Sequence, residues 1–350
     1  VRHYSPSGQE SAAVEYLVGR MAELGFTYSY RDEVGNAIGV MGDGPRQVVL
    51  LGHIDTVPGE IPVRIAPLPQ GEGSGVRALY GRGSVDAKGP LAAFVDAVAA
   101  VGPIEGWQFV VIGAIDEERN SIGARHIVDK YHPDFAIIGE PSQWSRVTLG
   151  YKGSAWAEIG VTRPVEHTAG QGQSAPEAAV EAWNAIRAWV DEFNAGRERA
   201  FDQLLLTLRG FNSETDHFQD TATLRVGVRL PPDVSPQEWY QILQTSEIFK
   251  ISEVSVKSTG FPIPAYKAGR NTPLVRAFLG AIHAAGEKPG FVVKTGTADL
   301  NIVAPIWNCP AVAYGPGDSA LDHTPDEHIS LVKYGKAVSV LTRVLQTLAT

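Results

Sequence analysis

The chain has 350 residues, of which 44% are hydrophobic and 20% charged, enough for a large core and for two domains of roughly 100–200 residues each. Its net charge is -9 and no basic run stands out, which argues against nucleic acid and anionic membranes as partners. No apolar run reaches the roughly 18–20 residues of a membrane-spanning helix, and no signal peptide is visible. The single cysteine, Cys309, excludes an internal disulfide and a thiolate-rich zinc site, and is typical of the reducing cytoplasm.

The first part of the chain alternates predicted helices with short apolar strands. A helix opens within residues 7–25, where Ser7 and Glu10 have capping-box spacing and Gly25 is a typical terminator. Further helices are predicted at 91–100 and 121–131, and strands at 36–41, 47–53, 107–116, 134–140 and 147–151. This alternation predicts an α/β domain with a mostly parallel sheet flanked by helices.

The pattern changes near residue 152. Helical segments at 174–193 and 235–246 stand among strand-like segments at 153–162, 202–211, 221–230 and 251–260. This order predicts an α+β insert with helices on one face of an antiparallel sheet. The α/β pattern returns at residue 271 and runs to a closing helix within 327–349. We therefore expect a discontinuous α/β domain, residues 1–151 and 268–350, interrupted by an α+β domain, residues 152–267.

Acidic residues and histidines follow the predicted strands and precede one helix. They are His53 with Asp55, Asp86, the run Asp116 to Glu118, Glu140, and His323. In an open α/β sheet, ligands bind outside the carboxyl ends of the strands, so these side chains are expected at one edge. Asp86 lies in the stretch GRGSVDAKGP, whose glycines allow close approach of the backbone.

Each feature has an ordinary explanation when taken alone. Asp86 fits a helix N-cap among turn-forming glycines, a lone histidine is commonly structural, and adjacent glutamates commonly face solvent. The turn GPGDSA imitates a dinucleotide loop, but its proline and the downstream His-Thr-Pro argue against one. Five such places in one sheet are different, because clustered carboxylates repel each other unless positive charge lies among them.

Two divalent metal ions would supply that charge. Carboxylate and imidazole are ligands that zinc accepts. Two histidines and two glutamates give two terminal ligands per ion, one aspartate can bridge both ions, and a shared water completes each shell. Two zinc ions outweigh three carboxylates in charge. The excess favours hydroxide over water between them, which is how a two-metal site produces a nucleophile near neutral pH.

The motifs resemble those of a known family. GHIDTVP, GRGSVDAKG, DEE, GEPS and a late HTPDE occur in the order of the di-zinc amidohydrolases, which include acetylornithine deacetylase, succinyl-diaminopimelate desuccinylase, aminoacylase and carboxypeptidase G. They cover both arms of the predicted α/β domain. The resemblance implies two Zn²⁺ ions, with Co²⁺ as a substitute, and an inserted lid domain that makes the contacts of a homodimer.

Carried over residue by residue, the resemblance assigns the metal ligands. Asp86 corresponds to the carboxylate that bridges both ions. The terminal ligands are His53 with Glu140 for one zinc, and Glu118 with His323 for the other.

The resemblance also implies catalytic roles. Glu117 corresponds to the general base, and Asp55 would hold the His53 ring through its other nitrogen. The peptide after the bridging aspartate is commonly cis in this family, so we expect a cis Asp86–Ala87 bond. The lid histidine that reaches the partner subunit's active site corresponds to His167 in VEHTAGQGQSAPEAA, the alternative being a surface loop histidine.

The segments GYKGS, KTGTADLN and YGPGDSALDHTP are most similar to a narrower group of the family. Those hydrolases release lysine or ornithine from the amino-group carrier protein LysW, in lysine or arginine biosynthesis. They cleave the amide between the carrier's C-terminal glutamate side chain and the α-amino group of the product. Arg270, Lys294 and Thr297 are the candidate substrate contacts. Because the carrier and this chain are both acidic, attraction requires a local basic patch, which Lys152, Lys267, Arg270 and Lys294 could form.

Two classes of function remain open. A non-catalytic binding protein of this fold would be expected to have lost Glu117 or a metal ligand, and this chain retains them. Among enzymes, a deacylase of free acetyl- or succinyl-amino acids is the main alternative to the carrier hydrolase. The apolar segments AWAEIGV and AAVEAWNAIRAWV are the expected dimer surface.

Overall fold

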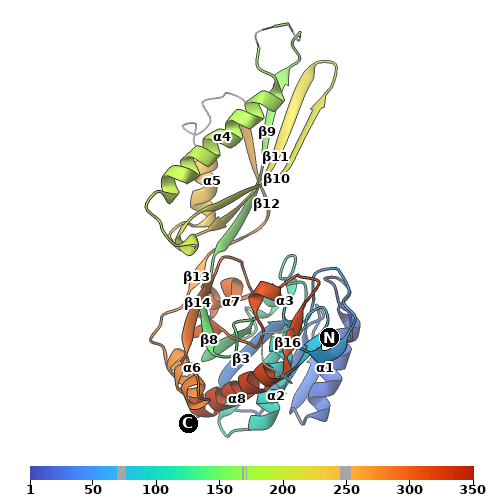
Figure 1. The fold of residues 1–350 in the computed structure, drawn as a ribbon, viewed down its shortest axis with the longest axis vertical. Helices are drawn as coiled ribbons and strands as arrows, with labels where there is room; N and C mark the ends of the chain where they lie inside the picture. The colour runs from blue at the N-terminus through green and yellow to red at the C-terminus, as the bar shows by residue number, and fades with distance from the viewer. Residues whose placement is uncertain (69–75, 168, 171, 245–253) are drawn as a thin grey trace. The chain divides into compact units, whose positions relative to one another are not determined.

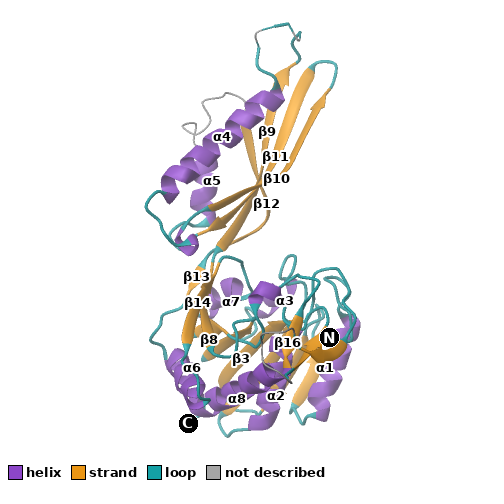
Figure 2. Ribbon diagram, viewed as in Figure 1, coloured by secondary structure: helices purple, strands orange, loops and turns teal. Residues whose placement is uncertain are grey.

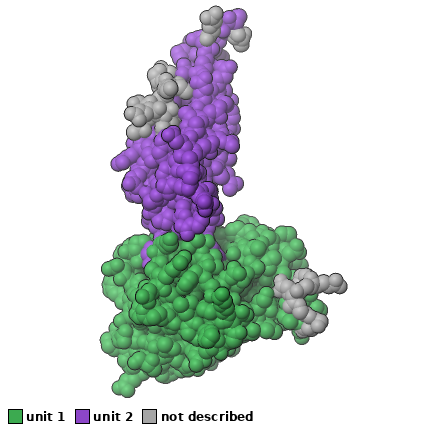
Figure 3. Space-filling view, turned by 60° about the vertical axis from the view of Figure 1, so that its left-hand side comes forward, with its two compact units in different colours: residues 1–150, 267–293, 298–350 green, residues 151–266, 294–297 purple. Residues whose placement is uncertain are grey.

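The computed structural model describes residues 1–350 apart from 69–75, 168, 171 and 245–253. The chain forms two compact units (Figure 3). The first comprises Val1–Gly150, Lys267–Val293 and Ala298–Thr350, and the second comprises Tyr151–Tyr266 and Lys294–Thr297. The segment 294–297 thus packs with the second unit although the chain on both sides of it belongs to the first.

The first unit is built on a mixed β-sheet (Figure 1). In pairing order its described strands are β1 (Tyr28–Arg31), β2 (Ala37–Met41), β6 (Trp107–Ala114), β3 (Arg46–His53), β7 (Phe135–Gly139), β15 (Ala311–Ala313), β8 (Arg146–Tyr151) and β13 (Tyr266–Lys267), and β14 (Gly290–Lys294) also pairs with β8. β6, β3, β7 and β15 run parallel, whereas β1, β2 and β8 pair antiparallel with their neighbours. The predicted α/β class is confirmed, with the parallel part confined to the centre.

The central strands are buried along most of their length. Residues 48–53 of β3 are buried without alternation, as expected of a strand covered on both faces. The helices of this unit are α1 (Ser11–Glu23), α2 (Lys88–Val101), α3 (Ile122–Ile127), α6 (Pro273–Ala284), α7 (Leu300–Trp307) and α8 (Leu331–Leu348). α8 packs against α2 and α6 on one side of the sheet, and α3 contacts α7 on the other (Figure 1). None of the helices in the described ranges is long and apolar enough to cross a membrane.

A small antiparallel sheet joins two distant parts of the chain. It contains β4 (Arg64–Pro67), β5 (Arg77–Tyr80) and β16 (His328–Ser330), with β5 in the middle. The segment before Asp86 is therefore paired with the segment after His323. A short 3-10 turn, Ser319–Leu321, lies just before this histidine.

The second unit is an antiparallel sheet with helices on one face (Figure 2). Its strands pair in the order β10 (Leu205–Thr215), β11 (Gln219–Leu230), β9 (Gly153–Pro164) and β12 (Val254–Ile263). Its helices are α4 (Ala175–Asn194), α5 (Pro236–Gln244) and the 3-10 turn Ala200–Asp202. The α+β prediction is confirmed for this unit, although the expected positions 245–246 and 251–253 lie outside the described residues.

One local prediction was wrong. The Ser7–Glu10 capping box does not form: α1 starts at Ser11, and the Ser7 hydroxyl donates to Asp55 instead, at 2.7 Å. The expected dimer surface stays a prediction, and much of its apolar face is covered within the unit. Every second residue of β9 from Ala155 to Val161 is buried against the inner face of α4, in the core of the unit itself.

Lys152 is buried and cannot form part of a surface patch. Its ammonium donates to the carbonyl oxygens of Ala200 and Phe201, at 3.1 Å each, and to that of Gln203. Burial lowers the pKa of Lys152 to about 8. The side chain thus connects the junction between β8 and β9 to the turn at residues 200–203.

The substitution Lys152→Met should lower the free energy of unfolding by about 2–4 kcal/mol, because buried carbonyl oxygens without a donor cost about 1–3 kcal/mol each. Urea unfolding followed by tryptophan fluorescence measures this. Lys257→Met, at an exposed position of β12, is the matched control and should change stability by less than about 0.5 kcal/mol. Equal effects of the two substitutions would contradict the role given to Lys152.

Candidate metal centre

Three adjacent parallel strands bring most of the predicted site together. His53 ends β3, Asp116 to Glu118 follow β6, and Glu140 follows β7. In register, His53 pairs with Ala114 and Gly52 pairs with Gly139. The carboxyl ends of these strands therefore lie side by side, which gathers one histidine and several acids at one edge of the sheet.

Asp86 enters this edge from the turn before α2. The Asp86–Ala87 peptide is cis, as the resemblance implied. Two glycines make room for the turn: Gly83 has a φ of 82°, and a side chain at Gly89 would collide with the carbonyl oxygen of Ser84. The glycines around Asp86 thus serve the close packing of the turn that carries it.

The two carboxylate oxygens of Asp86 face two different histidines. Oδ1 lies 3.1 Å from Nε2 of His53, and Oδ2 lies 3.0 Å from Nε2 of His323. His323 Nε2 is also 3.1 Å from Oε1 of Glu118. Ligand atoms of His53, Asp86 and Glu118 all lie within 4.8 Å of one another. Imidazole nitrogens around a carboxylate with both oxygens engaged fit a bridged pair of divalent ions.

The electrostatics of the cluster favour positive charge. Hydrogen bonds with Asp86 and Glu118 raise the pKa of His323 to about 10. Burial would lower the pKa of His53, but its contacts with Asp55 and Asp86 raise it well above the usual range. The carboxylates therefore stabilise cations between them, as a metal-binding site must.

Glu117 stands beside this cluster with a different environment. Burial raises the pKa of Glu117 well above its usual value; the charge of His53 opposes this, and those of Asp299, Glu140 and Glu118 add to it. Glu117 is not among the residues whose ligand atoms converge. A carboxyl group near the ligands that prefers its proton is suited to acid–base work.

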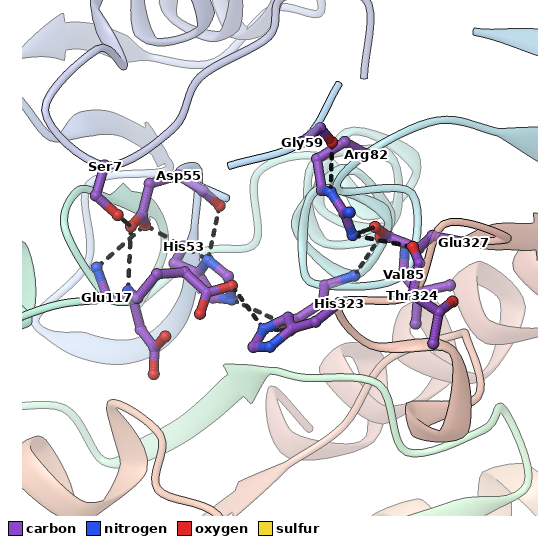
Figure 4. Close-up of polar contacts among 12 residues, drawn as sticks. Ser7, His53, Asp55, Gly59, Arg82, Val85, Glu117, His323, Thr324 and Glu327 are labelled. Atoms are coloured by element: carbon purple, nitrogen blue, oxygen red, sulfur yellow. Dashed lines mark hydrogen bonds and ion pairs between the residues drawn. The ribbon is translucent and has the colours of Figure 1, made fainter. Parts of the chain in front are cut away.

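Asp55 holds the turn that carries the two glutamates (Figure 4). Its carboxylate accepts hydrogen bonds from the backbone N–H of Glu117 and of Glu118, both at 3.1 Å, and from the Ser7 hydroxyl. The other nitrogen of His53, Nδ1, lies 3.0 Å from the carbonyl oxygen of Asp55 and 3.5 Å from its carboxylate. Asp55 thus contacts His53 mainly through its backbone.

The other predicted residues lie elsewhere. His167, in an exposed loop of the second unit, accepts at Nδ1 from the N–H of Ala169. In that unit Lys294 lies over the Tyr151 ring, 5.6 Å from its centroid, and Thr297 Oγ1 accepts from Arg229 at 3.1 Å. In the first unit, Arg270 lies 5.6 Å from the Phe291 ring centroid. Their contact with substrate stays a prediction.

Several buried charged residues near the site were not predicted. They are Arg82, Asp299 and Glu327. Burial raises the pKa of Asp299, with some offset from nearby His53, to about 6. In the sequence these residues cannot be told from surface charges, although Arg82 and Glu327 do lie within the GRGSVDAKG and HTPDE motifs.

A second group of potential ligands does not fit a metal. Asp32, Glu33 and His126 converge at the surface, but the ammonium of Lys130 lies 2.6 Å from both Glu33 Oε1 and His126 Nε2. The lysine already neutralises this cluster.

Donors of this kind, with an acid–base carboxyl group next to them, are typical of a metal-dependent hydrolase. The chain belongs to peptidase family M20/M25/M40, whose model matches residues 49–347.

Two relatives are similar to this chain over almost its whole length. A [LysW]-lysine hydrolase of Deinococcus radiodurans is 43% identical, over 98% of this chain and 93% of its own length. A putative [LysW]-lysine/[LysW]-ornithine hydrolase of Thermococcus kodakarensis is 41% identical, over 99% of this chain and 90% of its own.

Solved structures share the fold at low identity. A tripeptidase from Staphylococcus aureus superposes with a TM-score of 0.78 at 18% identity, covering 99% of this chain and 95% of that one. A dinuclear metal binding peptidase of the M20 family from Bacillus subtilis gives a TM-score of 0.70 at 13% identity, with coverage of 99% and 95%.

Proposed function

We propose that this protein is a di-zinc hydrolase that releases lysine or ornithine from the γ-glutamyl amide of the carrier protein LysW. The observation that carries the metal chemistry is Asp86, whose two oxygens face two separate histidines. The substrate rests on relatives of that name at 41–43% identity over nearly the full chain. They do not favour the alternatives, acetylornithine deacetylase and succinyl-diaminopimelate desuccinylase. Such a biosynthetic hydrolase acts in the cytoplasm.

The five ligands divide between two positions. Asp86 would serve both. His53 and Glu140 would hold one ion, and Glu118 and His323 would hold the other. Bound ions supply positive charge that polarises the scissile carbonyl and acidifies the attacking water. We assign zinc as the ion because histidine and carboxylate ligands suit it.

Glu117 moves the proton. Its carboxylate takes a proton from the attacking water and delivers it to the amide nitrogen, which leaves as the α-amino group of the product. Asp55 keeps Glu117 beside the ligands by accepting the backbone N–H groups of Glu117 and Glu118. His167 of a partner subunit assists the developing negative charge on the carbonyl oxygen.

Substrate choice falls to residues outside the metal centre. We assign the binding of a carboxylate, of the product or of the carrier terminus, to Arg270 or Lys294, and a hydroxyl contact with the substrate to Thr297. An arginine can bind a carboxylate with two hydrogen bonds, which fixes orientation as well as charge. Lys152 is buried and is therefore excluded from docking the acidic carrier; Lys267, Arg270 and Lys294 remain the candidate contacts.

Glu117→Gln should retain about two zinc ions per chain and lose roughly a hundredfold or more in turnover, as expected for a lost general base. Glu118→Gln, which changes the adjacent side chain, is the matched variant and should lose one zinc. Metal analysis by mass spectrometry and steady-state kinetics measure both. Loss of metal in Glu117→Gln would make Glu117 a ligand and contradict the assignment.

The homodimer is expected to form at the open edge of β10. This edge strand carries Leu208 and Phe211, which are 39% and 48% exposed, and the adjoining turn carries Phe218 at 81%. Unpaired strand edges are ready templates for a second chain. Sedimentation at micromolar concentration should give a dimer for the wild type and a monomer for Phe211→Asp. Phe261→Asp, on the opposite edge strand β12, is the control and should remain dimeric. A monomeric wild type would also remove the basis for a shared His167.

Carrier-linked lysine should be hydrolysed faster than acetylornithine. Exposed charges are screened over about 8–10 Å at physiological salt. The kcat/KM for the acidic carrier should therefore fall as salt rises, while that for the small substrate changes little. Rates on both substrates between 50 and 500 mM NaCl test this. Equal rates with equal salt responses would favour a plain deacylase.

A further inference from the structure

Arg82 and Glu327 form a buried ion pair beside the metal centre (Figure 4). Nη1 of Arg82 lies 2.9 Å from Oε2 of Glu327, and the two side chains are 8% and 0% exposed. Neither residue has a role in the proposed reaction. A buried ion pair is a weak source of stability, because desolvating the two charges offsets most of their attraction. The reason for burying this ion pair is therefore sought in the other contacts of Arg82 and Glu327.

Glu327 holds the turn that carries Asp86. Its Oε1 atom accepts the backbone N–H groups of Val85 at 2.8 Å and of Asp86 at 3.1 Å, across a sequence separation of 241 for the latter. Two consecutive N–H groups directed at one oxygen fix the orientation of two successive peptide planes. The direction in which the Asp86 side chain leaves the backbone is thereby fixed.

Arg82 holds the loop that carries His323. Its Nη1 donates to the carbonyl oxygen of Thr324, the next residue, at 3.2 Å, and its Nε donates to that of Gly59 at 2.9 Å. One guanidinium thus joins the loop after Asp55 to the loop around His323. Through the Arg82–Glu327 ion pair, the turn that carries Asp86 is connected to the loop that carries His323.

His323 needs such support from its backbone. Its side chain is 51% exposed, and its φ of 61° is uncommon for a residue other than glycine. Its ring contacts Asp86 and Glu118, which are themselves proposed ligands. A histidine with little packing around it depends on its loop for the distance between its Nε2 and the Asp86 carboxylate.

We propose that Arg82 and Glu327 act as a clamp that sets the spacing of Asp86 and His323, and with it the affinity of the metal position that these residues share with Glu118. The clamp rests on the proposed di-metal centre. It makes Arg82 and Glu327 positioning residues, which touch neither substrate nor metal. Loss of an outer contact of this kind typically costs about 10–100-fold in metal affinity.

Two conservative substitutions test the clamp from opposite ends. Glu327→Gln keeps an oxygen for the N–H groups of Val85 and Asp86 but removes the charge that pairs with Arg82. Arg82→Lys keeps the charge but cannot reach Glu327, Thr324 and Gly59 together. Metal-free protein is titrated with Co²⁺, and the two dissociation constants are measured by visible absorption and competition with a chelator. Folding is checked by circular dichroism, and if one variant does not fold, the other decides.

The matched control is Tyr334→Phe. The Tyr334 hydroxyl donates to Asp96 at 2.6 Å and joins α8 to α2, the helices that follow Glu327 and Asp86 in the chain. This substitution removes a contact between the same two parts of the fold without touching either ligand loop. It should lower the melting temperature and leave both dissociation constants unchanged.

The expected result is that at least one folded clamp variant weakens one Co²⁺ position by about tenfold or more, with a smaller effect on the other. That position should be the one abolished by Glu118→Gln. Wild-type affinity at both positions in the folded variants would overturn the clamp, as would equal losses at both positions that Tyr334→Phe reproduces. A wild-type chain that binds fewer than two ions would instead overturn the di-metal centre, and the clamp with it.

Discussion

The structure depends on the placement of several carboxylates at one edge of a buried sheet. Asp86, Glu118 and Glu140 are drawn there by three different chain segments, with Glu117 close behind. Like charges at such distances raise one another's pKa or disperse unless cations lie among them. The effect of these carboxylates is visible on either side of Asp86, where they raise the pKa of His53 and of His323. Two divalent ions at this edge of the sheet would compensate the negative charge more fully.

Two carboxylates hold the ligand-bearing turns in the same way. On one side, the Asp55 carboxylate accepts the N–H groups of Glu117 and Glu118. On the other, the Glu327 carboxylate accepts those of Val85 and Asp86. A carboxylate that receives two successive backbone N–H groups orients peptide planes and leaves the neighbouring side chains free to bind. Asp55 and Glu327 direct carboxylate oxygens at backbone N–H groups, and the acidic side chains on the turns that they hold are left available for a ligand.

The sequence predicted the parts that rest on local patterns. Buried parallel strands have a strong signal, so the strand ends that carry His53 and Glu140 could be placed, and the glycines around Asp86 indicated a crowded turn. Other predictions failed because contacts with distant parts of the chain outweighed the local pattern. The spacing of Ser7 and Glu10 suits a capping box, but the Ser7 hydroxyl has a stronger acceptor in Asp55. Apolar periodicity in residues 155–161 identified a buried face without indicating that α4 of the same unit covers it. The strands β4, β5 and β16 are too short to show a periodic pattern. The pairing of Arg82 with Glu327 joins residues far apart in the sequence, so no local pattern predicts it.

The segment from Lys294 to Asp299 connects the proposed substrate contacts Lys294 and Thr297, in the second unit, to a residue of the first unit. In the proposed reaction the metal centre acts only on the scissile amide, which is common to all the candidate substrates, so discrimination would have to come from other residues. Thr297 is hydrogen-bonded to Arg229 within the second unit, whereas Asp299, two residues later, is buried in the first with its charge acting on Glu117. If a substrate group binds at Thr297 as proposed, two peptide bonds connect that residue to Asp299, whose charge acts on Glu117, the proposed general base. Under the proposed mechanism, the backbone between Thr297 and Asp299 would then connect substrate binding to proton transfer.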